Sequence, residues 1–133
     1  MANRDEIVNE ILQLTDEKLD EISDFILSKS QEFHITNGNV DTGLLLRSGN
    51  VNRQFLYKEV VYTAPYSSFI EFGTGPHPVS GLVLERWVER KLRIKQPGAK
   101  KVAWAIAHKI SKKGTKPYPF LRPAAELARS KYG

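Results

Sequence analysis

The 133-residue sequence has no cysteine, and this absence removes several kinds of chemistry at once. Disulfide bonds, thiolate nucleophiles, cysteine-based zinc sites and iron–sulfur clusters are all excluded. The sequence also lacks an apolar run near the roughly 20 residues that cross a bilayer, and its acidic start does not resemble a signal peptide. We therefore expect a soluble protein that is made in the cytoplasm and has no membrane partner.

Residues for acid–base or metal chemistry are also scarce. The three histidines, His34, His77 and His108, have no second histidine or carboxylate at the spacing of metal ligands. His77 follows Glu71 by six residues, so an acid–base pair is conceivable, although a role in a turn or an interface is favoured. Segment 73–75 has two glycines but lacks the other residues of a phosphate-binding loop. We expect no enzymatic activity, no cofactor and no metal.

The residues that are present are typical of a globular chain. Hydrophobic residues make up 41% of the sequence and charged residues 26%, which argues against a disordered chain. The length suits one domain of ordinary size better than two. We expect a single domain that spans residues 1–133.

The charges are distributed unevenly along the chain, although the net charge is only +5. Residues 1–33 contain nine acids and three bases, whereas residues 34–133 contain six acids and seventeen bases. Within 86–116 there are eleven bases, and Glu89 is the only acid. This asymmetry favours a polyanionic partner or the association of acidic and basic surfaces. A solvated basic face is the alternative interpretation.

The first half of the chain contains one long periodic segment and one segment typical of strands. Residues 4–33 carry apolar side chains within one arc of a helical projection, which predicts a long amphipathic helix followed by a turn at 34–39. The acids of this helix are expected to alternate around its solvent face. Residues 44–48 suit one or two helical turns, and residues 51–64 predict a bent strand or a hairpin about Tyr57-Lys58.

The second half predicts short helices separated by loops. A short helix is expected over 66–72 and a glycine- and proline-rich loop over 73–78. Helices are expected over 82–93 and 99–112, an extended segment over 116–123, and a final helix over 124–131. The apolar side of the 82–93 helix is expected to contain Val83, Leu84, Trp87 and Val88. Trp104 lies off the apolar arc of its helix. The fold class is therefore α+β, with a long N-terminal helix and two or three shorter helices packed on a small, mainly antiparallel sheet.

Three motifs consist mainly of small and apolar residues with no chemistry of their own. They are Asp41-Thr42-Gly43-x-Leu45-x-Arg47-Ser48, the segment from Thr63 to Thr74, and the segment from Gly114 to Ala124. In order, spacing and chain length they resemble the minor tail-component family of long-tailed bacteriophages, also described as tail-completion or head–tail joining (neck) proteins. The family often has Tyr-Ala where this chain has Ser67-Ser68, which is a mild departure.

The resemblance implies a non-enzymatic structural protein of the virion, made in the host cytoplasm and placed at the tail or neck. Subunits of this family form rings, commonly six-fold, around the channel that conducts the genome. The implied partners are further copies of the chain and other phage neck and tail proteins, with non-specific contact to packaged DNA as an additional possibility. The family motif and candidate subunit interface comprise Tyr66, Phe69, Glu71, Phe72, Gly73, Thr74, Pro119, Phe120, Arg122 and Pro123. A structural role in folding is the favoured alternative for these residues.

The basic residues have two candidate uses in such a ring. They could contact the acidic helix of the next subunit, or they could face DNA phosphates in the channel without sequence preference. The residues concerned are Arg86, Arg90, Arg93, Lys101, Lys109, Lys112 and Lys113. We favour protein contact, because a channel that must release DNA gains little from binding it strongly. A small basic nucleic-acid-binding protein unrelated to virions is the alternative function, and an RNase-like toxin centred on Glu71 and His77 is a remote third.

Overall fold

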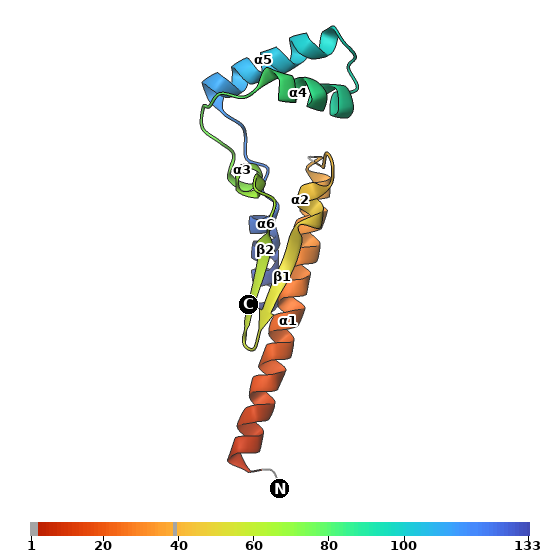
Figure 1. The fold of residues 1–133 in the computed structure, drawn as a ribbon. Coiled ribbons are helices and arrows are strands. Elements are labelled where there is room, and N and C mark those ends of the chain that lie inside the picture. The colour runs from red at the N-terminus through yellow and green to blue at the C-terminus, as the bar shows by residue number, and fades with distance from the viewer. Residues whose placement is uncertain (1–2, 39) are drawn as a thin grey trace. The chain divides into compact units, whose positions relative to one another are not determined.

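The computed structural model describes residues 3–38 and 40–133, and it confirms the α+β class (Figure 1). Its elements, in chain order, are α1 (Arg4–Thr36), α2 (Leu44–Arg47), β1 (Gly49–Gln54), β2 (Tyr57–Tyr62), α3 (Ser67–Phe72), α4 (Gly81–Trp87), a π-helical turn (Val88–Leu92), α5 (Gly98–Lys113) and α6 (Leu121–Tyr132). They form two compact units. Unit 1 comprises Met1–Ser67 and Tyr118–Gly133, and unit 2 comprises Ser68–Pro117.

Helix α1 is the longest element, and capping fixes its start. The Asn3 side chain accepts a hydrogen bond from the Glu6 backbone N–H, and the Glu6 side chain accepts one from the Asn3 backbone N–H. The helix continues through Thr36, so the prediction of a turn at 34–39 is wrong for its first three residues. Residue 39 lies outside the described residues. The helix is prolonged because His34 is 1% exposed and packs on Phe120, a contact that local sequence does not reveal.

Strands β1 and β2 form an antiparallel hairpin, which settles the choice between a hairpin and a bent strand. Gln54 pairs with Tyr57, so the turn consists of Phe55 and Leu56 and lies two residues before the predicted position. Leu56 has a φ of 63°, and its backbone N–H donates a 2.7 Å hydrogen bond to the Asp16 side chain. The Asp16 carboxylate on α1 thus helps to hold Leu56 in a left-handed conformation, which leucine rarely adopts.

The interior of unit 1 is small and centres on Phe120, the largest fully buried side chain. The ring of Tyr62 meets the Phe120 ring edge-on at 4.8 Å, and the Tyr62 hydroxyl lies 2.6 Å from Ser30 Oγ. Helix α6 packs along α1 and begins at Leu121, three residues earlier than predicted. Pro123 therefore lies in the first helical turn, where proline is tolerated because its missing N–H has no helical partner.

Unit 2 is built around the contact between α4 and α5. Val88, Ala99 and Ala103 are fully buried there, and the alanines let the two helices approach closely. Val83 is 64% exposed, so its predicted place on the apolar side of the helix is wrong. The predicted helix over 82–93 changes from α to π geometry after Trp87.

We expect the pH dependence of unfolding to include a contribution from His34. Burial lowers the pKa of His34, and its Nδ1 has no hydrogen-bond partner among the described residues. Because the folded pKa lies below the unfolded value of about 6.5, the unfolded chain binds the proton more readily. Stability should be complete above that value and should fall as the pH drops below it.

The His34→Leu variant should lose this component when thermal unfolding is compared between about pH 7.5 and pH 5.5, above the range in which carboxylates titrate. The variant Ser28→Ala, changed at an exposed position of the same helix and lacking a titrating group, is the control and should keep the pH dependence of the original chain. An unchanged pH dependence in His34→Leu would contradict the prediction.

Candidate assembly surfaces

The described part of the chain contains no group of three or more His, Asp or Glu side chains that could hold a metal ion. His77 Nδ1 lies 2.9 Å from the Gly75 carbonyl oxygen and 3.3 Å from Thr74 Oγ1. The imidazole is therefore tied to its own loop, which supports a turn-stabilising role. Glu71, the other member of the conceivable acid–base pair, is 8% exposed within α3.

The structure brings two of the three motifs together in unit 2. Thr74 and Thr115 exchange two backbone hydrogen bonds of 3.1 Å, and their hydroxyl oxygens lie 2.9 Å apart. Gly73 and Gly114 both have positive φ angles, and an added Cβ at Gly73 would lie 2.6 Å from the Thr115 carbonyl oxygen. A Cβ at Gly114 would overlap the Thr74 carbonyl. Glycine is thus required at both positions, because the two backbone segments lie too close together for a side chain. This supports a role in folding for this part of the motif.

The other motif residues divide between interior and surface. Phe120 is 1% exposed and lies inside unit 1, so the structure agrees with a core role and leaves no exposed ring for a neighbouring subunit. Phe69 and Phe72 are 57% and 67% exposed and remain available for contact. Asn37 Nδ2 donates a 3.0 Å hydrogen bond to the Pro119 carbonyl oxygen, which fixes the segment before α6. The remaining motif residues are partly buried or exposed, namely Tyr66, Arg122 and Pro123.

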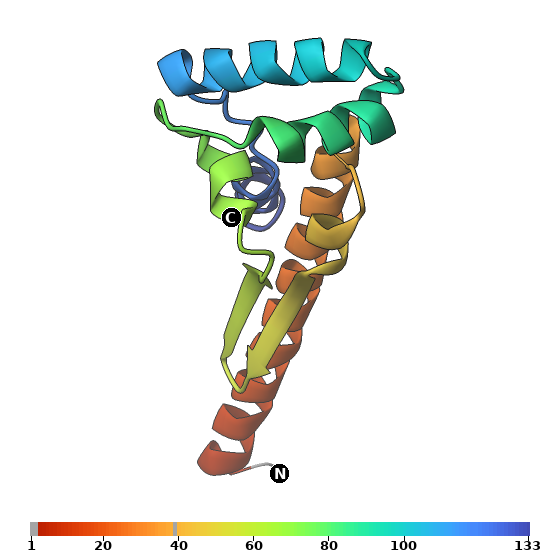
Figure 2. The ribbon, with the colours of Figure 1, turned by 45° about the horizontal axis from the view of Figure 1, so that its top comes forward.

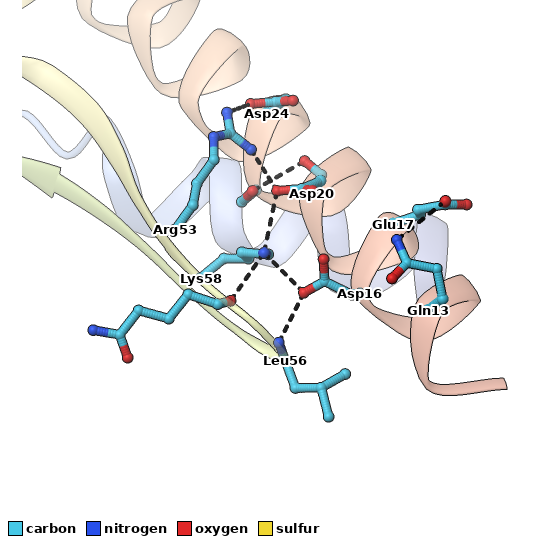
Figure 3. A network of polar contacts seen from close by, with 10 residues as sticks. Gln13, Asp16, Glu17, Asp20, Asp24, Arg53, Leu56 and Lys58 are labelled. Carbon is cyan, nitrogen blue, oxygen red and sulfur yellow. Dashed lines mark hydrogen bonds and ion pairs between the residues drawn. The ribbon is translucent and has the colours of Figure 1, made fainter. Parts of the chain in front are cut away.

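A network of ion pairs joins α1 to the hairpin, and it was not predicted (Figure 3). Lys58 Nζ lies 2.9 Å from Asp16 Oδ1 and 3.5 Å from Asp20 Oδ1, and the Lys58 side chain is only 6% exposed. Arg53 pairs with Asp20 at 2.6 Å and also with Asp24. The expectation that the acids of this helix do not converge is therefore wrong for these three aspartates. These aspartates are spaced four residues apart and so lie on one helix face. This spacing is the sequence signal that could have predicted the network.

The network shifts the pKa values of Asp16 and Lys58 in the directions that favour their charged forms. Hydrogen bonds from Lys58 and from the Leu56 backbone lower the pKa of Asp16. The same pairing with Asp16 raises the pKa of Lys58. These aspartates are consequently used within unit 1, and the acids left for a partner are those elsewhere on α1.

The first three turns of α1 extend past the rest of unit 1 (Figures 1 and 2). Leu56 at the hairpin turn contacts Asp16, and the Lys18 ammonium lies 5.2 Å from the ring of Tyr132 near the end of α6. Before these positions four apolar side chains of α1 are 45–57% exposed, namely Ile7, Val8, Ile11 and Leu14, whereas Leu12 is partly buried. We call Arg4–Leu14 the overhang. It also carries three exposed acids, Asp5, Glu6 and Glu10.

Closer to the hairpin, the same side of α1 borders an open apolar hollow of about 460 Å³ within unit 1. Leu19, Ile22 and Ile26 line it from α1, with contributions from the hairpin and α6. The predicted apolar arc is thus covered only in part, because the two strands have six residues each and are shorter than the 33-residue helix.

Unit 2 carries the predicted basic residues on its surface. All seven are exposed: Arg86, Arg90, Arg93, Lys101, Lys109, Lys112 and Lys113. Trp104 is 55% exposed, as its place off the apolar arc indicated, and its ring packs over Gly81. The next residue along α4, Leu82, is 59% exposed. Bases and large apolar groups therefore share the surface of this unit.

Comparison of the chain with known protein families, curated proteins and solved structures finds no match. Among the described residues, no helix has the length and apolar character needed to cross a membrane.

We expect Asp16→Asn to weaken the hold of the hairpin on α1. The pairing keeps the folded pKa of Asp16 low, so this stabilisation is complete above the unfolded value of about 3.9 and is lost as the pH falls through the folded value. At neutral pH, thermal unfolding of Asp16→Asn should have a lower midpoint than the original chain, since Lys58 loses its nearest partner. Glu17→Gln removes a neighbouring exposed carboxylate and should change the midpoint less. Equal effects of the two substitutions would contradict the argument.

Proposed function

We propose that the chain is a structural protein of a phage virion that completes the tail or joins head to tail. The proposal rests on the three motifs in family order together with one structural observation. Among the described residues, seventeen large apolar side chains are at least 37% exposed. Single exposed apolar residues are ordinary, whereas extended apolar surface is typical of a chain that works in contact with other proteins.

The distribution of that surface supports an assembly role. Exposed apolar groups occur on the overhang, at the hairpin turn, on α3 and on unit 2, while the interiors consist largely of alanines and Phe120. The hollow beside α1 is open and largely apolar, and the described residues hold no group of three or more His, Asp or Glu side chains that could bind a metal. In the proposed role six subunits assemble into a ring around the DNA channel and contact neck and tail proteins. No cofactor or metal takes part.

The alternative function, non-specific nucleic-acid binding, is favoured by one observation, the exposed bases of unit 2. That unit contains eleven lysines and arginines and three glutamates. Such a surface neutralises phosphates without reading bases.

The proposed function predicts a specific phenotype in the phage that carries this gene. A nonsense codon early in the gene should yield filled heads separate from tails, or joined particles that fail to infect, when lysates are viewed by negative-stain electron microscopy. A synonymous change at the same codon is the control. Normal, infectious particles from the nonsense allele would overturn the proposal.

Duplex-DNA binding by the purified chain separates the two functions. For the structural role we expect weak binding at ~0.15 M salt that declines log-linearly as salt is raised. The triple change Lys109→Gln, Lys112→Gln and Lys113→Gln should reduce the salt slope, and Lys18→Gln, on α1, should not. Nanomolar affinity at that salt concentration would favour the nucleic-acid-binding function instead.

A further inference from the structure

We propose that the overhang of α1 in one copy of the chain docks on the α4–α5 surface of unit 2 in a second copy. The contact is head-to-tail, because the two surfaces are different parts of the same chain. The inference deepens the proposed function and rests on it, since it names the surfaces by which neighbouring subunits would join.

The overhang presents an apolar stripe beside acids. Ile7, Ile11 and Leu14 follow the spacing that places side chains on one helix face, and the first two are 47% and 56% exposed. Glu10 lies next to this stripe on the helical projection, and Glu17 continues the acidic edge one turn beyond Leu14. A partner for this face must therefore supply apolar groups together with bases.

The exposed face of α5 has those properties. Lys101, Trp104, His108 and Lys112 recur at intervals of three or four residues and therefore lie on one side of the helix. All four are exposed, with Trp104 at 55%. Because Trp104 rests on Gly81, its ring is held in place and can serve as a fixed apolar anchor. We call these four residues the docking face.

The two surfaces also match in length. At 1.5 Å per residue, the overhang is about 17 Å long and the span from Lys101 to Lys112 is about 18 Å. A helix lying along α5 could therefore place its apolar stripe against Trp104 with its acids near the lysines at either end. Opposite charges at such a contact guide partners together and set their register.

Charge disfavours the symmetric alternative, in which two overhangs pack on each other. That arrangement would bring Asp5, Glu6 and Glu10 of both copies together, and Arg4 is the only base between Arg4 and Leu14 to offset them. An overhang bound to unit 2 avoids this repulsion. A contact between two different surfaces leaves one free surface of each kind, so it extends into a closed ring or a filament.

The experiment uses two full-length variants with opposite defects. The overhang variant carries Ile7→Gln and Ile11→Gln, and the face variant carries Lys101→Glu and Lys112→Glu. All four positions are exposed, so both variants should fold, which circular dichroism can check. A third variant, with Lys95→Glu and Lys116→Glu, has the same net charge as the face variant and alters other exposed lysines of unit 2.

Sedimentation equilibrium of the purified proteins gives the readout. We expect the original chain and the Lys95/Lys116 variant to associate with rising concentration, with affinity weakened roughly tenfold or more at high salt. Each defective variant alone should remain monomeric. An equimolar mixture of the two should form a one-to-one dimer and nothing larger, because only one intact pair of surfaces remains.

Three results would overturn the inference: a monomeric original chain at every concentration, a mixture that stays monomeric, or a face variant that still associates by itself. The last would indicate pairing of overhangs. Failure of the proposed function is a separate result, since infectious particles from the nonsense allele would overturn the virion role whatever the sedimentation data show. Conversely, unjoined particles combined with a monomeric original chain would overturn the docking contact alone.

Discussion

The packing of the β1–β2 hairpin on α1 decides which parts of the long helix are available to other molecules. Lys58 and Arg53 draw Asp16, Asp20 and Asp24 into ion pairs, and Asp16 also accepts the backbone N–H of the hairpin turn. The hairpin can cover only the stretch of helix that it reaches. Most of the helix before Asp16 remains exposed, including Ile7, Ile11 and Leu14 and the acids Asp5, Glu6 and Glu10.

The small side chains in the two interiors also affect how much apolar surface stays exposed. Ala124 and Ala128 in unit 1, and Ala99 and Ala103 in unit 2, let helices approach closely but bury little apolar area. Larger side chains such as Trp104 and Phe72 are left on the surface. A chain arranged in this way leaves much apolar surface available for contact, which is consistent with the proposed assembly role.

The motifs and the contact surfaces are largely different residues. Gly73, Thr74 and Gly114 hold two loops together through the backbone, and Phe120 fills the interior of unit 1. The exposed surfaces used in the docking inference carry no motif residue. These motif residues therefore support the folded structure, while the docking inference depends on charge and exposed apolar groups.

Sequence alone determined the long helix, the strand-rich segment, the short helices and the exposed bases, because each depends on local periodicity or composition. It also marked Trp104 as an outlier and favoured Phe120 as a core residue. Tertiary structure decided the extension of α1 through His34, the position of the turn at Leu56 and the pairing of Asp16 with Lys58. The physical reason is that each of these depends on a partner far along the chain, and the cost or gain of that contact exceeds the local preference of the residue.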